Sequence, residues 1–137
     1  MTRAGRRLRR EDGQSLVEFA VVVQVFLLVL FLLFQGGIAW FNKLALEQAT
    51  REAARKATVN RSLGQAAMTQ LATDEVLNVA SNLDQSKLKA AGNISVSSPT
   101  WAMGDDLTVE AKYPFTIGVF GVGWSGTIDV KTAMRIE

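Results

Sequence analysis

The chain has 137 residues with 15 Lys and Arg, 13 Asp and Glu, and a formal net charge of +2; it has no Cys and no His. A chain of this length holds at most one small folded domain beside a membrane segment. The absence of Cys and His excludes disulfides, thiolate nucleophiles, His-based triads and the usual zinc ligand sets. We therefore expect a protein that is not an enzyme.

The N-terminal residues 1–13 form a basic leader. Five of the 15 basic residues and two of the 13 acidic residues lie there, so the rest has 10 basic and 11 acidic residues and a net charge of −1. No basic excess then remains to indicate nucleic-acid binding. Because cytoplasmic flanks of membrane spans are enriched in Lys and Arg, the leader predicts a cytoplasmic N terminus and an extracytoplasmic C terminus.

An apolar run follows the leader. The 26 residues from Leu16 to Phe41 include one ionisable side chain, that of Glu18. About 20 apolar residues at about 1.5 Å rise each are enough to cross a bilayer. The pattern predicts a transmembrane helix over residues 14–41, with Trp40 and Phe41 as an interfacial anchor. Residues 42–137 are then the extracytoplasmic domain.

Glu18 lies inside the apolar run, where a carboxylate is costly. One interpretation is that it reaches the nearby headgroups. In the other, cleavage after Gly13 exposes an amine on Gln14, one helical turn away, which pairs with Glu18. If a neighbouring subunit supplied the amine, the ion pair would fix the offset between packed helices. Gly13 suits a protease that needs an extended backbone.

Two glutamines mark a further candidate contact face within the run. Gln24 and Gln35 are 11 residues, or three turns, apart and fall on nearly the same side of a helix. They could bond to a partner helix or be tolerated singly. Gly37-Ile38-Ala39 offers small residues to a signal peptidase, but a 39-residue signal peptide is too long.

Beyond the membrane, the pattern predicts a helix over 44–57 with alanines every fourth residue. Ala45, Ala49, Ala53 and Ala57 form a stripe that packs either on the chain's own sheet or on a neighbouring subunit. Asn60-Arg61-Ser62 is a break. A second amphipathic stretch covers 63–83, with an interruption possible at 73–75; its expected buried side is Leu63, Ala67, Leu71, Val76, Val79, Ala80 and Leu83.

After Gly92 the period changes to the alternation of strands. A short strand holds Ile94 and Val96. A second places Leu107, Val109, Ala111 and Tyr113 inward and should stop, or become an edge, at Pro114. We expect a glycine-rich loop at 118–126 and a last strand whose inner face is Ile128, Val130, Thr132, Met134 and Ile136.

Two local patterns look like binding motifs but predict no binding site. Met103-Gly104-Asp105-Asp106 is explained as a turn without calcium. Gly121 to Gly126 matches G-x-G-x-x-G, but a strand follows instead of the helix that a dinucleotide needs. We expect neither a metal, nor a cofactor, nor a small-molecule substrate.

Four segments together resemble the TadE-like family, the minor pilins or pseudopilins of the tight-adherence (Tad/Flp) branch of type IV pili. They are Gly13–Ala20, with Phe19 following Glu18, then Leu44–Arg55, Tyr113-Pro114-Phe115 and Ala133–Glu137. The chain departs from the family pattern at Gln24, where many relatives have proline, and at Gln35, where an acid is common.

The resemblance implies an α+β fold of type IV pilin kind: a long N-terminal transmembrane helix that continues outside the membrane and packs on a small antiparallel sheet. It also implies cleavage after Gly13 by a prepilin peptidase, and association with other pilins and the Tad assembly platform in a bacterial inner membrane. The alternative is an uncleaved single-pass anchor that presents an extracytoplasmic binding domain.

Overall fold

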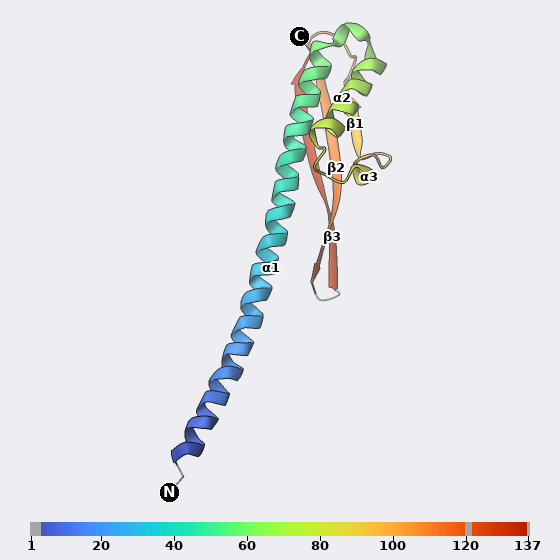
Figure 1. Ribbon diagram of the computed structural model, residues 1–137. Coiled ribbons are helices and arrows are strands. Elements are labelled where there is room, and N and C mark those ends of the chain that lie inside the picture. The colour runs from blue at the N-terminus through green and yellow to red at the C-terminus, as the bar shows by residue number, and fades with distance from the viewer. Residues whose placement is uncertain (1–3, 120–121, 137) are drawn as a thin grey trace. The chain divides into compact units, whose positions relative to one another are not determined.

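The computed structural model describes residues 4–119 and 122–136, and side chains are described for 13–118 and 123–136. The chain divides into two compact units, residues 1–38 and 39–137. In order, the elements are α1 (Ala4–Val59), the short 3-10 helix η1 (Arg61–Leu63), α2 (Gln65–Val79), α3 (Gln85–Leu88), β1 (Ile94–Ser97), β2 (Asp106–Val119) and β3 (Val122–Arg135) (Figure 1). The predicted α+β class, with a long apolar helix and a small antiparallel sheet, is confirmed.

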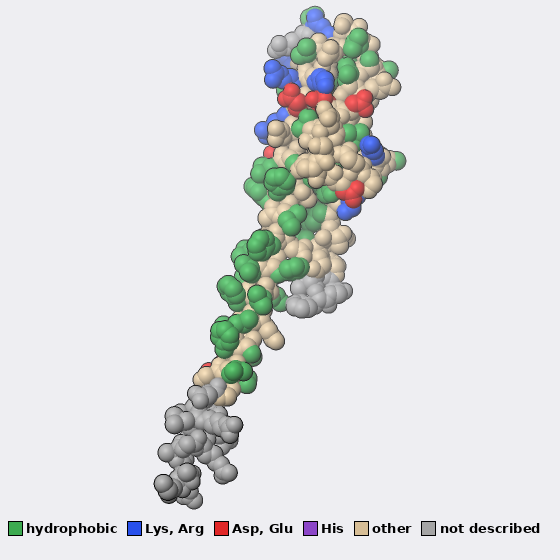
Figure 2. All heavy atoms as spheres, in the orientation of Figure 1, with side chains coloured by type: hydrophobic (Ala, Val, Ile, Leu, Met, Phe, Trp, Pro, Cys, Tyr) green, Lys and Arg blue, Asp and Glu red, His purple; other side chains and the backbone are tan. Residues whose placement is uncertain are grey.

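The first unit is the N-terminal part of α1. Its apolar side chains have no core to enter, so large residues such as Phe19, Phe26 and Leu33 are more than 60% exposed. α1 is long and apolar enough to cross a membrane, with a mean hydropathy of 2.8 in its most apolar window, none of which is buried. Figure 2 shows apolar side chains covering the helix, whereas charged side chains gather on the domain.

The second unit contains the last part of α1, the shorter helices and the sheet. The sheet has three antiparallel strands in the order β1-β2-β3. Tyr113 of β2 pairs with Ile128 of β3, and Ile94 of β1 pairs with Ala111 of β2. The predicted inner face of β2 is confirmed, since Leu107, Val109, Ala111 and Tyr113 are buried. On the last strand the predicted face also turns inward: Val130 and, just after β3, Ile136 are buried, whereas Ile128, Thr132 and Met134 are half-buried.

The predicted second helix is present, but its buried side was partly wrong. The helix runs through 73–75 without interruption. It buries Met68, Ala72 and Val76, and Leu63 is 59% exposed outside it. The reason is the register: α2 begins after Gly64, at φ 85°, so its buried stripe starts at Met68.

The glycine-rich loop expected at 118–126 was also wrong. β2 continues to Val119 and β3 begins at Val122, so most of that segment is paired strand; residues 120 and 121 lie outside the described part. Nor does Pro114 stop β2, since it pairs with Thr127. The N–H of Lys112 points toward β1 and donates to the Asn93 carbonyl. Pro114, two residues later, faces the same side, but there β1 has already ended, so no hydrogen bond is lost because proline has no N–H. The edge role predicted for Pro114 is therefore correct.

Candidate functional site

The start of the apolar helix holds the residues that the sequence singled out for processing. Gln14, Glu18 and Phe19 lie within α1 and are exposed. The Gln14 side-chain amide donates to Glu18 Oε1 at 3.1 Å. The structure therefore brings Gln14 and Glu18 together on one helical turn, the spacing on which the pairing hypothesis depends.

Gly13, the last residue of the predicted leader, is helical in this structure, because α1 runs through it. The extended backbone that we expected there for a protease is thus not the conformation observed. No atom lies within 4 Å of the place where a Cβ would stand at Gly13. A peptidase that cuts after it would first have to unwind the helix, which a glycine makes easier.

The glutamine face lies further along the same helix. Gln24 is exposed and Gln35 is half-buried. Both keep the helical spacing that was predicted, and their contact with a partner helix stays a prediction.

The alanine stripe lies in the second unit and turns inward. Ala49, Ala53 and Ala57 are 0% exposed and belong to the same core as Leu107 and Val109. Of the two interpretations of the stripe, burial supports packing on the chain's own sheet. Ala45 is half-buried, so the contact with another subunit that we proposed for Ala45 remains a prediction.

Two hydroxyls join α1 to β3 beside this stripe. The hydroxyl oxygens of Thr50 and Thr132 are 3.0 Å apart, and Thr50 Oγ1 donates to the Glu47 carbonyl at 3.1 Å. Further along, Thr58 Oγ1 donates to the Arg55 carbonyl at 2.9 Å and contacts Met134 Sδ at 3.9 Å. These contacts fix how the helix lies on the strand.

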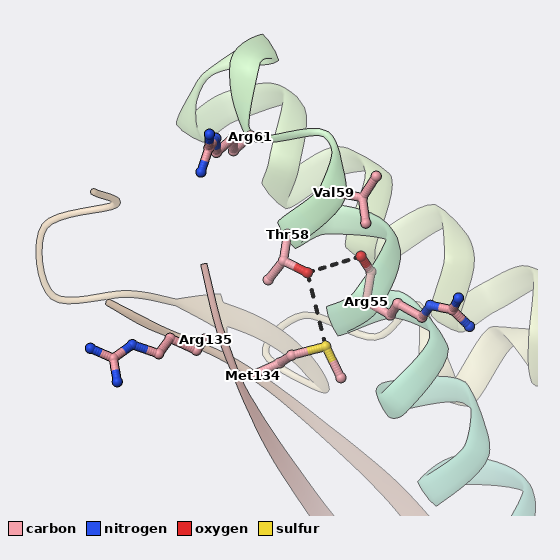
Figure 3. Close-up of a pocket in the computed structure, with 6 residues that line it drawn as sticks. All are labelled: Arg55, Thr58, Val59, Arg61, Met134 and Arg135. Carbon is pink, nitrogen blue, oxygen red and sulfur yellow. Dashed lines mark hydrogen bonds between the residues drawn. The ribbon is translucent and has the colours of Figure 1, made fainter. Parts of the chain in front are cut away.

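A pocket of about 580 Å³ opens beside Thr58 and is lined by Arg55, Thr58, Val59, Arg61, Met134 and Arg135. Figure 3 shows Arg55 extending to the opposite side from Arg61 and Arg135. Like charges therefore surround the opening without converging on one point. Because the Thr58 hydroxyl is already bonded to the helix, the arrangement among these residues offers no activated nucleophile.

The turn before β2 is ordered by one carboxylate. Asp105 Oδ2 accepts from the Thr100 hydroxyl, from the Thr100 N–H at 2.8 Å and from the Ala102 N–H at 3.3 Å. These bonds, that from the Thr100 hydroxyl first, lower the pKa of Asp105 below its ordinary value of 3.8. The turn predicted at 103–106 is confirmed, with Gly104 at φ 93°.

Sequence reasoning missed a surface at the far end of the β2–β3 hairpin. Phe115, Ile117, Trp124, Ser125 and Gly126 line a shallow hollow of about 180 Å³, and Trp124 is 81% exposed. The glycines of this segment favour a loop, which hides the surface in the sequence. The pattern that would have found it is the absence of any charged residue from 113 to 128.

Residues 13–55 match the family model of TadE-like proteins. The match includes Gly13, Gln14, Glu18 and the helix that carries the alanine stripe, and it confirms over this range the resemblance found in the sequence. It relates the chain to the Tad pilus and its components in general. No curated protein and no solved structure matches the chain.

Proposed function

We propose that this chain is a non-enzymatic pseudopilin or minor pilin of a Tad pilus, cut after Gly13 by a prepilin peptidase and then used in pilus assembly. One observation carries the proposal. Within the range that matches the TadE-like model, the residue after the leader glycine and the acid of the apolar helix lie on one turn and touch, at 3.1 Å.

The chemistry follows from that turn. Cleavage gives Gln14 an α-amine while Glu18 stays four residues away. An amine and a carboxylate in a low-dielectric surrounding attract strongly, whereas either alone is costly. Glu18 would pair with the amine of its own chain or with that of a neighbour. Pairing with a neighbour sets the axial offset between two packed helices.

Removal of the leader also changes how the chain is held in the membrane. The five leader arginines favour the cytoplasmic side and resist transfer across lipid. Without them an assembly machinery can lift the helix outward, into the base, shaft or tip of a pilus. We place the subunit in a bacterial inner membrane as a single-pass protein, with other pilins and the assembly platform as its partners. Adhesion or secretion would be the downstream role.

The N-terminal residue of the chain recovered from membranes of its host tests the proposal. Gln14 is expected, because cleavage after Gly13 exposes it. Met1 would support the alternative, a permanent single-pass anchor that presents a binding domain, and Trp40 would support a signal peptide.

A pair of glycine variants sharpens this test. Gly13→Ala should slow or abolish processing, since a more stable helix is harder to unwind at the cut. Gly37→Ala is the matched control: Gly37 is also helical, also has no atom within 4 Å of its Cβ position and gains the same helix propensity of about 1 kcal/mol. Mass spectrometry measures the processed fraction of each variant. Equal processing of both variants would contradict a cut at Gly13.

A further inference from the structure

The β2–β3 hairpin reaches well beyond the rest of the sheet. β1 pairs with β2 at Thr108–Ala111, but the pairing of β2 with β3 continues to Val119 and Val122. The 16 residues 113–128 include no Asp, Glu, Lys or Arg. Lys112 and Asp129, which are register partners, form the charged border of this hairpin end.

The hairpin end presents aromatic side chains. Trp124 is 81% exposed, the highest value among the large apolar residues for which exposure is described. The Phe115 ring lies against Gly126, where an added Cβ would come within 2.8 Å of the ring. An exposed, charge-free aromatic surface of this kind is typical of a binding surface.

The direction in which the hairpin end points follows from contacts inside the second unit. Thr50 meets Thr132, and eight residues later on α1 Thr58 meets Met134. Residue numbers thus increase in the same direction along α1 and β3, as Figure 1 also shows. Trp124, which precedes Thr132, therefore lies toward the Ala39 end of the helix.

The charged border of the hairpin end lies about level with Lys43, the residue at which α1 becomes charged. Asp129 is three residues before Thr132, about 10 Å along a strand. Lys43 is seven residues before Thr50, about 10 Å along a helix, and is the first charged residue after the apolar run. Both elements become charge-free at about the same height, and Trp124 lies about 16 Å further on.

We propose that the hairpin end, in its described residues 113–119 and 122–128, docks in the lipid headgroup region of the membrane that α1 enters. Trp and Tyr prefer this region. Trp40 and Phe41 lie about 3–5 Å beyond Lys43 on α1, a height that falls within the span of the hairpin end, between its charged border and Trp124. A surface without charged side chains loses little hydration free energy when it leaves water. The outer edges of a two-stranded ribbon carry open backbone groups, so the hairpin lies in the interface and does not cross the hydrocarbon.

This proposal rests on α1 as a membrane helix, and it is independent of cleavage after Gly13 and of any pilus. The full, uncleaved chain can therefore be tested in vesicles of phosphatidylethanolamine and phosphatidylglycerol. Because the chain has no Cys, a single Cys can be labelled with an environment-sensitive fluorophore without background. Ser125→Cys places the label beside Trp124, and Lys131→Cys, also exposed and on the same face of β3, is the matched control above the border.

The readout is quenching by lipids that carry a nitroxide near the headgroup. We expect several-fold stronger quenching at Ser125→Cys than at Lys131→Cys, and loss of that difference when Trp124→Glu is added. Equal quenching at the two positions would overturn the proposal. So would a difference that disappears as the protein is diluted in lipid, because the hairpin would then contact a second copy.

A third label, at Val25→Cys in the apolar helix, reports insertion in the same vesicles. Strong quenching there by nitroxides deep in the acyl chains is expected. Its absence would overturn the docking proposal together with the membrane role of α1. Processing at Gly13, measured separately in the host, is unaffected by any of these results.

Discussion

At the scale of single residues, the charge of Glu18 carries the assembly hypothesis. The Gln14 amide already contacts this carboxylate, and an amine on Gln14 would add a charge to that contact. Glu18→Gln keeps a hydrogen-bonding group of the same size but removes the charge. We expect the variant to be inserted and processed normally while pilus production falls by about tenfold or more, the effect of about 1.4 kcal/mol.

Glu52→Gln is the control for this experiment, since it makes the same change from carboxylate to amide at an exposed position of α1 beyond the apolar run. Pili are counted by electron microscopy, and processing is followed by the mass of the chain. Normal piliation with Glu18→Gln would show that the carboxylate serves only to reach the headgroups.

The Thr50 hydroxyl is the polar link inside the helix–sheet interface. Thr50 is 0% exposed. Its hydroxyl contacts the hydroxyl of Thr132 and donates to the Glu47 carbonyl. Thr50→Val leaves the half-buried Thr132 hydroxyl without this partner and should lower the free energy of unfolding by about 1–2 kcal/mol. Thermal unfolding of the chain in detergent measures the effect.

A double variant separates the hydrogen bond from packing. Thr50→Val with Thr132→Val removes both hydroxyls and should recover part of the loss, because no polar group is then left unpaired. A double variant as unstable as the sum of the single variants would contradict the link.

Asp105 gives the domain a pH dependence in acid. Its pKa is lowered in the folded chain, chiefly by the Thr100 hydroxyl, so the ionised form favours folding. The stability that this carboxylate contributes is fully present at pH values above 3.8, the ordinary pKa of Asp. It is lost as the pH falls below 3.8 and through the lower pKa of the folded chain. Asp105→Asn should lower the melting temperature at neutral pH, and the difference from wild type should shrink in this acid range.

Asp74→Asn, an exposed change on α2, is the control for the pH series. A destabilisation by Asp105→Asn that stayed constant from neutral pH down to pH 2 would show that the bonds to Thr100 and Ala102 do not depend on ionisation.

At the scale of elements, the alanine stripe lets α1 approach the sheet closely. Ala53 is 0% exposed, so the three heavy atoms that Ala53→Leu adds force the surrounding side chains to shift, and the change should cost about 1–3 kcal/mol of stability. Ala66→Leu, the same change on an exposed position of α2, should be near neutral. Denaturant unfolding compares the two. Equal stabilities would indicate that the helix–sheet interface is loose.

The elements that were predicted from the sequence are those with a regular period over many residues. The apolar run of α1, its alanines and the alternation along β2 and β3 each repeat often enough to indicate both the element and its buried face. The register of α2 was missed because Leu63 and Met68 both fit a helical stripe, and only the turn at Gly64 selects Met68.

The hairpin end was missed for another reason. Glycines at 118, 121, 123 and 126 indicated a loop, since glycine lowers strand propensity. Cross-strand pairing overrides that preference here. The ring of Phe115, the register partner of Gly126, fills the space that a side chain at Gly126 would need. The close contact of Gln14 with Glu18, in contrast, was implied by their spacing alone.

At the scale of the whole molecule, the second unit has a core of its own. Among the residues whose side chains the structure describes, those of this core lie between Leu46 and Ile136. A fragment of residues 42–137 should therefore unfold cooperatively, with a melting temperature within a few degrees of that of the domain in the full chain. Circular dichroism measures both, and a fragment without a cooperative transition would show that folding needs the membrane helix.

Pro114 affects how readily the exposed edge of β2 can pair with a strand of another chain. Beyond the end of β1, no strand among the described residues pairs with that edge of β2, and a bare strand edge is a template on which other chains stack into fibres. Pro114 removes a donor from that edge and crowds any incoming backbone, so a foreign strand would lose its ladder after one or two bonds. If copies of the chain are concentrated in a membrane, Pro114 would thereby hinder strand pairing between their exposed edges.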